Sequence, residues 1–324
     1  MSGPHRKIPP RRMPCDRPGL ARALSVRPPS TVELSRHDPR FAELNRCTLT
    51  MIGGGMPGAV FTVGAAPLLL GRSQECELRF DDPSVSAVHA EISRAAGEVY
   101  LRDLGSTNGT FVNGAALIKP RALQDGDRVQ LGRDGVVRVS FGDEGEERAR
   151  KALYERAIRD RLTGLYNRAF FDERIEIELA SARRHDEPLS LLLLDVDHFK
   201  ALNDRYGHLA GDEALRVLGA ILRKAARKED IAARFGGEEL VLLARGIGLA
   251  KAGVIAERLR RTIRAARISY LDQNIAVSAS IGVAARANFT HFRTPAELIN
   301  AADRALYEAK RGGRDRVAFA NEVT

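Results

Sequence analysis

The chain has 324 residues, of which 44% are hydrophobic and 29% charged. This composition is typical of globular domains, and the length allows two of them. Its longest apolar run, at about residues 189–194, is far shorter than the roughly 20 residues of a membrane-spanning helix. The basic N-terminus has no apolar secretory core and the three cysteines are widely separated, so we expect a cytoplasmic protein without a membrane segment.

The net charge of +9 raises the question of nucleic-acid binding. Residues 1–46 hold ten Lys and Arg against four Asp and Glu, so most of the excess lies in one segment and not on a folded face. That segment is rich in Pro, Arg and Ser and has no hydrophobic periodicity, which predicts a disordered basic tail over 1–46. Such a tail is weak support for nucleic-acid binding, and we do not expect a nucleic-acid partner.

Residues 47–142 consist of short apolar and β-branched segments separated by Gly, Asp, Asn and Pro. Examples are "CTLTMI", "PLLLGR", "HAEISR", "EVYLRDL" and "DRVQLG". Many short strands at near-regular spacing predict an all-β sandwich. The charged segment that follows, residues 143–159, has apolar residues at helical spacing and is expected to be a connecting helix.

Residues 160–324 alternate strand and helix patterns. The expected strands are "LSLLLLDV", "ELVLLAR" and "IAVSASIGVAA", while "DEALRVLGAILRKAAR" and "GLAKAGVIAERLRRTIRAA" have the periodicity of helices. A last helix is expected to start at Pro295 with Thr294 as its N-cap and to end at Gly312 and Gly313. The pattern predicts an α/β or α+β domain with a central sheet flanked by helices.

Carboxylates gather at two places in this second region. Glu238 and Glu239 follow two glycines in "RFGGEELVLL", directly before an apolar strand, and Asp195 and Asp197 follow the apolar run in "LLLLDVD". A surface turn is one explanation of the paired glutamates. A metal site is the other, because buried like charges are costly unless a cation joins them. We expect only one of the two aspartates to share a site with the glutamates.

Two further pairs of polar residues suit a nucleotide. Asn203 and Asp212 flank a glycine-rich turn, and an amide with a carboxylate can bind the edge of guanine, although such residues also cap turns. Lys310 and Arg314 are four residues apart and are expected on one side of a helix end. There they would suit a triphosphate or compensate the helix dipole.

In this order the motifs resemble the GGDEF family of diguanylate cyclases. The resemblance runs from about residue 160 to the end and rests on "DRLTGLYNR", "DVDHFKALNDRYGHLAGDEAL", "RFGGEEL", "SIGVA" and "ADRALYEAKRGGRD". It implies a sheet like that of nucleotidyl cyclases. It also implies the condensation of two GTP molecules into cyclic di-GMP and pyrophosphate by a homodimer, with Mg²⁺ or Mn²⁺, two ions per active half-site.

The resemblance also implies roles for single residues. Glu238 would hold metal and assist deprotonation of the attacking hydroxyl, Glu239 would complete the acidic cluster, and Asp197 would be structural. The expected site residues are, for metal and catalysis, Asp195, Val196 (backbone carbonyl), Glu238 and Glu239; for guanine, Asn203 and Asp212; and for the phosphates, Phe199, Lys200, Lys310 and Arg314.

Arg227 and Asp230 match an Arg-x-x-Asp motif with which this family often binds its own product as an inhibitor. The alternative is a surface ion pair worth a few tenths of a kcal/mol. Two positions depart from the family pattern: Leu240 replaces the usual Phe, and Asp315 stands where Asn is common. Neither position is an expected ligand, and Leu240 is expected to affect packing only.

Residues 47–142 resemble forkhead-associated (FHA) domains through "LLLGRS", "SVSAVH" and "LRDLGSTNGTFVNG". These β-sandwiches bind phosphothreonine peptides through loops at one end. Arg72 would bind phosphate with its forked cation, Ser86 would donate its hydroxyl, and Thr107 and Asn108 would hold peptide backbone. His89 is expected to brace the loops from inside.

Together these resemblances predict a diguanylate cyclase that is gated by phosphothreonine recognition and inhibited by its product. The gating peptide could be its own tail, which contains Thr31 in "STVEL". The competing hypothesis is a catalytically silent sensor or scaffold that binds cyclic di-GMP at Arg227 and Asp230. Ala87 stands where FHA domains often have a larger polar residue, which concerns one peptide contact and not phosphate binding.

Overall fold

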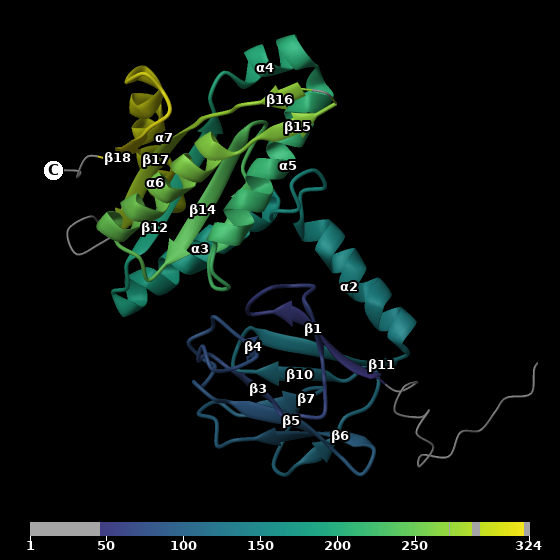
Figure 1. The fold of residues 1–324 in the computed structure, drawn as a ribbon. Coiled ribbons are helices and arrows are strands. Elements are labelled where there is room, and N and C mark those ends of the chain that lie inside the picture. The colour runs from purple at the N-terminus through teal and green to yellow at the C-terminus, as the bar shows by residue number, and fades with distance from the viewer. Residues whose placement is uncertain (1–45, 272, 287–291, 321–324) are drawn as a thin grey trace, which may run out of the picture.

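The computed structural model describes residues 46–271, 273–286 and 292–320, which form a β-sandwich and an α+β domain joined by one helix (Figure 1). The expected basic tail, apart from its last residue, and the candidate phosphosite Thr31 lie outside the described residues. Within the described ranges, none of the helices has the length and apolar character needed to cross a bilayer.

The N-terminal domain is an all-β sandwich, as the sequence predicts. One sheet has six strands in the order β2-β1-β11-β10-β7-β8, and the other has five in the order β4-β3-β5-β6-β9. Their inner faces fully bury Leu49, Leu70, Phe80, Ile92 and Val139, because alternate side chains of each strand point into the sandwich. The strands are β1 (Arg46–Gly53), β2 (Val60–Thr62), β3 (Leu68–Gly71), β4 (Leu78–Arg79), β5 (Ala90–Ala95), β6 (Glu98–Asp103), β7 (Thr110–Val112), β8 (Ala115–Ala116), β9 (Arg121–Ala122), β10 (Arg128–Leu131) and β11 (Gly135–Gly142).

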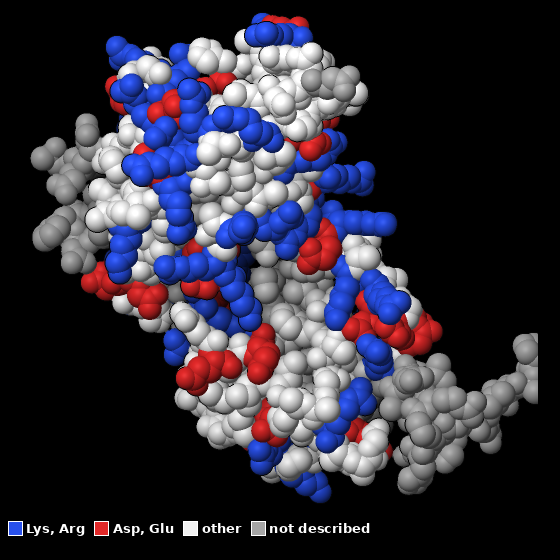
Figure 2. All heavy atoms as spheres, in the orientation of Figure 1, with Lys and Arg blue, Asp and Glu red and all other residues white. Residues whose placement is uncertain are grey.

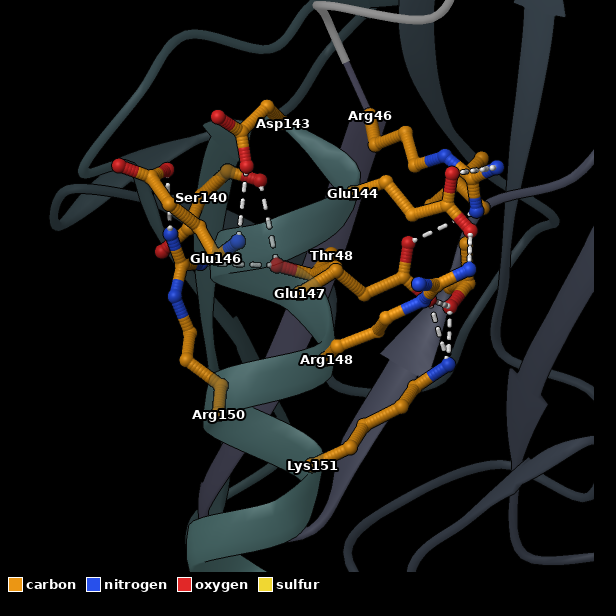
Figure 3. A network of polar contacts seen from close by, with 12 residues as sticks. Arg46, Thr48, Ser140, Asp143, Glu144, Glu146, Glu147, Arg148, Arg150 and Lys151 are labelled. Atoms are coloured by element: carbon orange, nitrogen blue, oxygen red, sulfur yellow. Dashed lines mark hydrogen bonds and ion pairs between the residues drawn. The ribbon is translucent and has the colours of Figure 1, made fainter.

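Helix α2 (Glu144–Ile158) connects the domains, and polar contacts hold its first turns against the sandwich (Figure 3). Asp143 caps the helix, because its carboxylate accepts a hydrogen bond from the backbone N–H of Glu146 in the first turn. The Glu147 carboxylate is buried between the Arg46 guanidinium, at 3.2 Å, and the Lys151 ammonium, at 2.6 Å. The start of α2 is therefore anchored to the sandwich by these contacts.

The C-terminal domain is built on a five-stranded sheet in the order β13-β14-β12-β17-β18, in which β17 and β18 pair in parallel and the other neighbours are antiparallel. A separate two-stranded sheet joins β15 and β16. The elements are α3 (Arg168–His185), β12 (Leu189–Val196), α4 (Phe199–Tyr206), α5 (His208–Ala225), β13 (Ile231–Arg234), β14 (Glu239–Arg245), α6 (Leu249–Ala265), β15 (Ile268–Tyr270), β16 (Gln273–Ile275), β17 (Ala279–Arg286), α7 (Pro295–Arg311) and β18 (Val317–Phe319).

Helices cover both faces of the central strand β12. Leu191 and Leu193 pack in one apolar cluster with α3 and α7, whereas Leu192 and Leu194 pack in another with α5 and α6. A strand that is buried on both faces needs a continuous apolar run instead of alternation. This arrangement confirms the α+β fold with a central sheet flanked by helices.

Several elements differ from the sequence-based expectation, among them a divided strand and an additional long helix. The strand expected over residues 275–285 is two strands, because β16 ends at Ile275 and β17 begins at Ala279; between them, the Ser278 carbonyl accepts a hydrogen bond from the backbone N–H of Asp197 at 2.9 Å. Helix α3 was not expected at all, and it is the longest helix of the domain together with α5.

Candidate functional site

The end of β12 brings together two carboxylates and an ammonium group. Asp195 lies directly opposite Glu239 of β14 and Ser280 of β17 in the antiparallel registers. Opposite residues share one face of the sheet, with Cβ atoms about 4.5–5.5 Å apart. On this face, Lys310 of α7 places its Nζ 2.8 Å from Asp195 Oδ2. The structure thus joins three residues that the sequence assigned to the active site.

Both carboxylates have raised pKa values. Burial raises the pKa of Asp195, and the charges of Glu238 and Asp197 act in the same direction, against the opposing Lys310. Burial also raises the pKa of Glu239, followed by the charge of Asp195. A single lysine does not fully compensate this acidic cluster, and a second cation would stabilise its ionised form.

Glu238, the expected metal ligand, is not the residue opposite Asp195. It precedes β14 in a bend and is half-buried, and its carboxylate has no hydrogen bond or ion pair to another described residue. Glu239 occupies the position across from Asp195 instead. It stays a prediction that Glu238 binds metal and assists deprotonation of the hydroxyl, and that Glu239 completes the acidic cluster.

The glycine turn before β14 is held by hydrogen bonds that sequence reasoning missed. Arg234 donates to the Gly237 carbonyl at 2.7 Å and pairs with Asp160 at 3.2 Å. A Cβ atom on Gly236 would lie 2.8 Å from a Glu239 carboxylate oxygen, whereas one on Gly237 would meet nothing within 4 Å. Gly236 therefore makes room for Glu239, and Gly237 leaves open backbone. Asp160 is the first residue of the family motif "DRLTGLYNR". That motif was the sequence signal from which a role of Asp160 near the site could have been predicted.

Asp197 has a structural role, as expected. Its carboxylate accepts hydrogen bonds from the Ser278 and Ser280 hydroxyls, both at 2.7 Å, and from the backbone N–H of Asp315 at 3.0 Å. These bonds tie the end of β12 to β17 and to the segment after α7. The Asp315 carboxylate pairs with Arg260 of α6 at 2.6 Å, which gives the departure from Asn a structural reason.

The two residues expected to bind guanine lie on two successive helices. Asn203 is on α4 and Asp212 is on α5, whose Gly211 has no room for a Cβ atom because the Asn203 Oδ1 would lie 2.0 Å away. Among the described residues, the buried Asn203 Oδ1 has no hydrogen-bond partner, and the Asp212 carboxylate contacts no polar group. A buried polar atom without a partner is costly, which is consistent with a site for a polar ligand.

The expected phosphate ligands do not share one helix. Phe199 and Lys200 open α4, where backbone N–H groups lack intrahelical acceptors. Lys310 and Arg314 were expected on one side of a helix end, but this prediction is wrong because α7 ends at Arg311 and Arg314 has a positive φ of 62°. Lys310 contacts Asp195, whereas the Arg314 side chain has no polar contact with other described residues.

The candidate inhibitory residues adopt a turn and not a surface ion pair. Asp230 is 8% exposed and accepts hydrogen bonds from the backbone N–H groups of Arg227, at 2.9 Å, and Arg245, at 3.3 Å. The Arg227 side chain is exposed and lies 3.9 Å from the Glu229 carboxylate. Arg227 and Asp230 both line a cavity of about 840 Å³ between the two domains.

The loops at one end of the sandwich place the expected phosphothreonine ligands together. The Ser86 Oγ accepts a hydrogen bond from the Thr107 backbone N–H at 3.1 Å, and Asn108 donates its amide to the Ser84 carbonyl at 2.8 Å. Arg72 directs its Nε–H to the Val85 carbonyl at 3.3 Å. This leaves the rest of the Arg72 guanidinium available to an anion.

His89 braces these loops from inside, as expected. It is fully buried, its Nδ1 accepts the Ser86 backbone N–H at 3.1 Å, and its Nε2–H donates to the Gly109 carbonyl at 3.1 Å. Burial lowers the pKa of His89 despite the opposing hydrogen bond to Gly109, so the neutral ring can make both bonds.

The five-stranded sheet with helices on both faces gives the C-terminal half an α+β fold like that of nucleotidyl cyclases. The sequence profile described as "Diguanylate cyclase, GGDEF domain" matches residues 157–316, and that described as "FHA domain" matches residues 68–132. The chain therefore contains a GGDEF domain, with an FHA domain N-terminal to it.

Two curated relatives each match about half of this chain. Diguanylate cyclase DgcP of Pseudomonas aeruginosa is 42% identical over 166 residues, which are 51% of this chain and 24% of that protein. YhcK of Bacillus subtilis is 41% identical over 167 residues, which are 50% of this chain and 45% of that protein. This chain thus spans half or less of either relative. The crystal structure of the coiled coil and GGDEF domain of DgcB from Caulobacter crescentus in complex with c-di-GMP is 31% identical, with a TM-score of 0.50, and covers 54% of this chain and 94% of that one.

Proposed function

We propose that this protein is a diguanylate cyclase that condenses two GTP molecules into cyclic di-GMP and releases two pyrophosphates. The observation that carries the proposal is the pair of carboxylates, Asp195 and Glu239, held opposite each other at the sheet edge with raised pKa values. Such a pair suits a hard divalent cation, because Mg²⁺ prefers carboxylate oxygens together with substrate phosphates.

The donor set fits a bound metal. Asp195, the Val196 carbonyl and the two glutamates supply oxygen ligands, and Mg²⁺ or Mn²⁺, two ions per half-site, would lower the pKa of the attacking hydroxyl and stabilise the leaving pyrophosphate. In the described parts of the chain, no three His, Cys, Asp or Glu side chains are grouped closely enough to hold a metal by themselves. The nucleotide phosphates would therefore complete the coordination.

The chain's own residues position the reacting groups. Asn203 and Asp212 hold guanine, and the start of α4 together with Lys310 and Arg314 binds the triphosphate. The 3′-hydroxyl then attacks the α-phosphorus of the other GTP, the bond to the bridging oxygen breaks, and pyrophosphate leaves. Glu238 accepts the hydroxyl proton, which its carboxylate is free to do because it has no polar contact to another described residue.

One domain binds one GTP, so two domains face each other about a two-fold axis during the reaction. We assign residues 47–142 to the FHA domain, 143–159 to the connecting helix and 160–324 to the cyclase domain. A phosphothreonine peptide binds at Arg72, Ser86, Thr107 and Asn108, and Thr31 of the tail is one candidate ligand. Cyclic di-GMP inhibits from Arg227 and Asp230.

Mass spectrometry of the reaction products tests the proposal. Wild type with GTP and Mg²⁺ should form cyclic di-GMP, and Glu239→Gln should abolish it. Glu308→Gln is the matched control, since this exposed glutamate of α7 makes a 3.8 Å surface pair with Arg311. If wild type forms no cyclic di-GMP with or without a phosphothreonine peptide, but binds added cyclic di-GMP through Arg227, the protein is a silent sensor instead.

A further inference from the structure

A small polar cavity lies between the two domains, beside the proposed phosphothreonine site. Its volume is about 160 Å³, and Figure 2 shows the molecule hollowed between the domains, with Lys and Arg side chains along the margin. The FHA loop after β3 and the last turn of α3 in the cyclase domain both contribute to its lining: Arg72, Ser73 and Gln74 from the loop, and Ser181, Arg184 and His185 from the helix.

Positive charge exceeds negative charge in this cavity. Four arginines line it, but only two carboxylates: Arg72, Arg79, Arg184 and Arg245 against Asp81 and Glu187. Two of the arginines are neutralised, because Arg79 pairs with Asp81 at 2.9 Å and Arg245 pairs with Glu178 at 2.8 Å. Arg184 makes no hydrogen bond or ion pair with another described residue. The cavity thus presents one unpaired cation from each domain, Arg72 and Arg184, against one unpaired carboxylate, Glu187, among the described residues.

Compensation of the helix dipole explains why α3 ends in basic residues, but not where Arg184 lies. Arg183, Arg184 and His185 form the basic last turn of α3, and each favours the helix end electrostatically. Arg183 does not line the cavity, and its guanidinium donates a hydrogen bond to the Arg293 carbonyl at 3.0 Å. Arg184 lines the cavity with Arg72 and remains unpaired.

We propose that a phosphothreonine peptide bound at Arg72 places a second acidic group in this cavity, where it pairs with Arg184. The inference rests on the proposed FHA function and adds to it a preference for peptides with a second acidic group. The cavity has room for one carboxylate or phosphoryl group, and unpaired guanidinium groups bind both with charge-assisted hydrogen bonds. The peptide then contacts both domains, so its binding restrains the cyclase domain directly as well as through α2.

Fluorescence anisotropy with the full chain tests the inference. Labelled phosphothreonine peptides carry Glu at each flanking position in turn, on an otherwise uncharged sequence, and a second series carries phosphoserine there. We expect Glu or phosphoserine at one position to tighten binding about tenfold, the effect of one charge-assisted hydrogen bond. Arg184→Ala should remove this gain and Arg183→Ala should keep it. The series with the larger Arg184-dependent gain identifies the acidic group.

Two results would overturn the inference while leaving the FHA proposal intact: no position at which an acidic group tightens binding, or a gain that persists undiminished in Arg184→Ala. A different result would remove both. If wild type binds no phosphothreonine peptide, or if Arg72→Ala binds as tightly as wild type, the FHA site itself is wrong and the second contact has no basis.

Discussion

Two buried carboxylates of this protein have opposite electrostatic surroundings. Glu147 at the start of α2 is 6% exposed and Asp195 at the sheet edge is 7% exposed. Burial alone would raise the pKa of Glu147, but hydrogen bonds from Lys151, Thr62 and Arg46 lower it to about 2. The pKa of Asp195 is instead raised, because burial and neighbouring acids outweigh one lysine.

The difference in pKa distinguishes Glu147, a carboxylate that stabilises the fold, from Asp195, a carboxylate suited to binding a ligand. Figure 3 shows the Glu147 carboxylate among cationic side chains from the sandwich and from α2, so its charge is compensated within the chain. At the sheet edge the chain leaves compensation incomplete, which favours binding of a cation at a cost in stability.

Asp195→Asn should give the largest effect on activity. Loss of one carboxylate from the metal site removes several kcal/mol of transition-state stabilisation, so cyclic di-GMP formation should fall roughly 10³-fold. The variant should fold about as stably as wild type, because the buried charge that is removed is compensated only in part by Lys310. Steady-state kinetics and urea denaturation measure the two quantities. A variant that is active, or that has lost stability in proportion to its activity, would contradict the contrast.

Glu147→Gln should have the opposite effect, a loss of stability with little change in activity. Removing the charge leaves Arg46 and Lys151 without their buried partner, so β1 and β2 should lose about 2 kcal/mol of protection in hydrogen exchange. Turnover by the cyclase domain should change less than about twofold at a temperature where the variant is folded. Glu144→Gln, at a more exposed position of the same turn, is the control and should cost below about 0.5 kcal/mol.

Gly236→Ala should lower activity by about tenfold, because the new Cβ atom would lie 2.8 Å from the Glu239 carboxylate and displace it. Gly237→Ala is the matched control in the same turn, since nothing lies within 4 Å of its Cβ position. Initial rates at saturating GTP compare the two. Equal losses would mean that the turn needs backbone freedom and not space for Glu239.

The pH dependence of stability should have opposite signs at the two carboxylates. The lowered pKa of Glu147 gives stability that is complete above its unfolded value near 4.5 and is lost as the pH falls toward about 2. The raised pKa values of Asp195 and Glu239 make stability fall as the pH rises from about 4 through their folded values. Denaturation of wild type, Glu147→Gln and Asp195→Asn across this range without metal separates the contributions, which are the smallest expected here. Slopes of the same sign would contradict the account.

Much of the site was predictable because it follows from local patterns. The apolar run before Asp195 predicted β12, and the apolar run after the paired glutamates predicted β14. The opposition of Asp195 and Glu239 was not predictable, since it depends on the register of two strands that are separated by two helices and another strand. The sequence therefore suggested Glu238 as a ligand without showing which glutamate faces Asp195.

Helix α3 was not predicted because buried ion pairs obscure its hydrophobic periodicity. Ile175 and Leu179 have helical spacing, but the residues directly before them, Arg174 and Glu178, are also buried, at 9% and 2% exposure. Arg174 pairs with Glu178 and lies 3.7 Å from Asp81 of the sandwich. Such interdomain pairing makes polar residues part of the buried face, so hydrophobic periodicity underestimates the helix.

Binding of Mn²⁺, followed by the electron paramagnetic resonance of the free ion, tests most directly whether the acidic edge is a cation site. In the presence of a non-hydrolysable GTP analogue, wild type and Glu147→Gln should both remove Mn²⁺ from solution. Asp195→Asn and Glu239→Gln should not do so at the same concentrations. Equal binding by all four proteins, or no binding by wild type, would contradict the account.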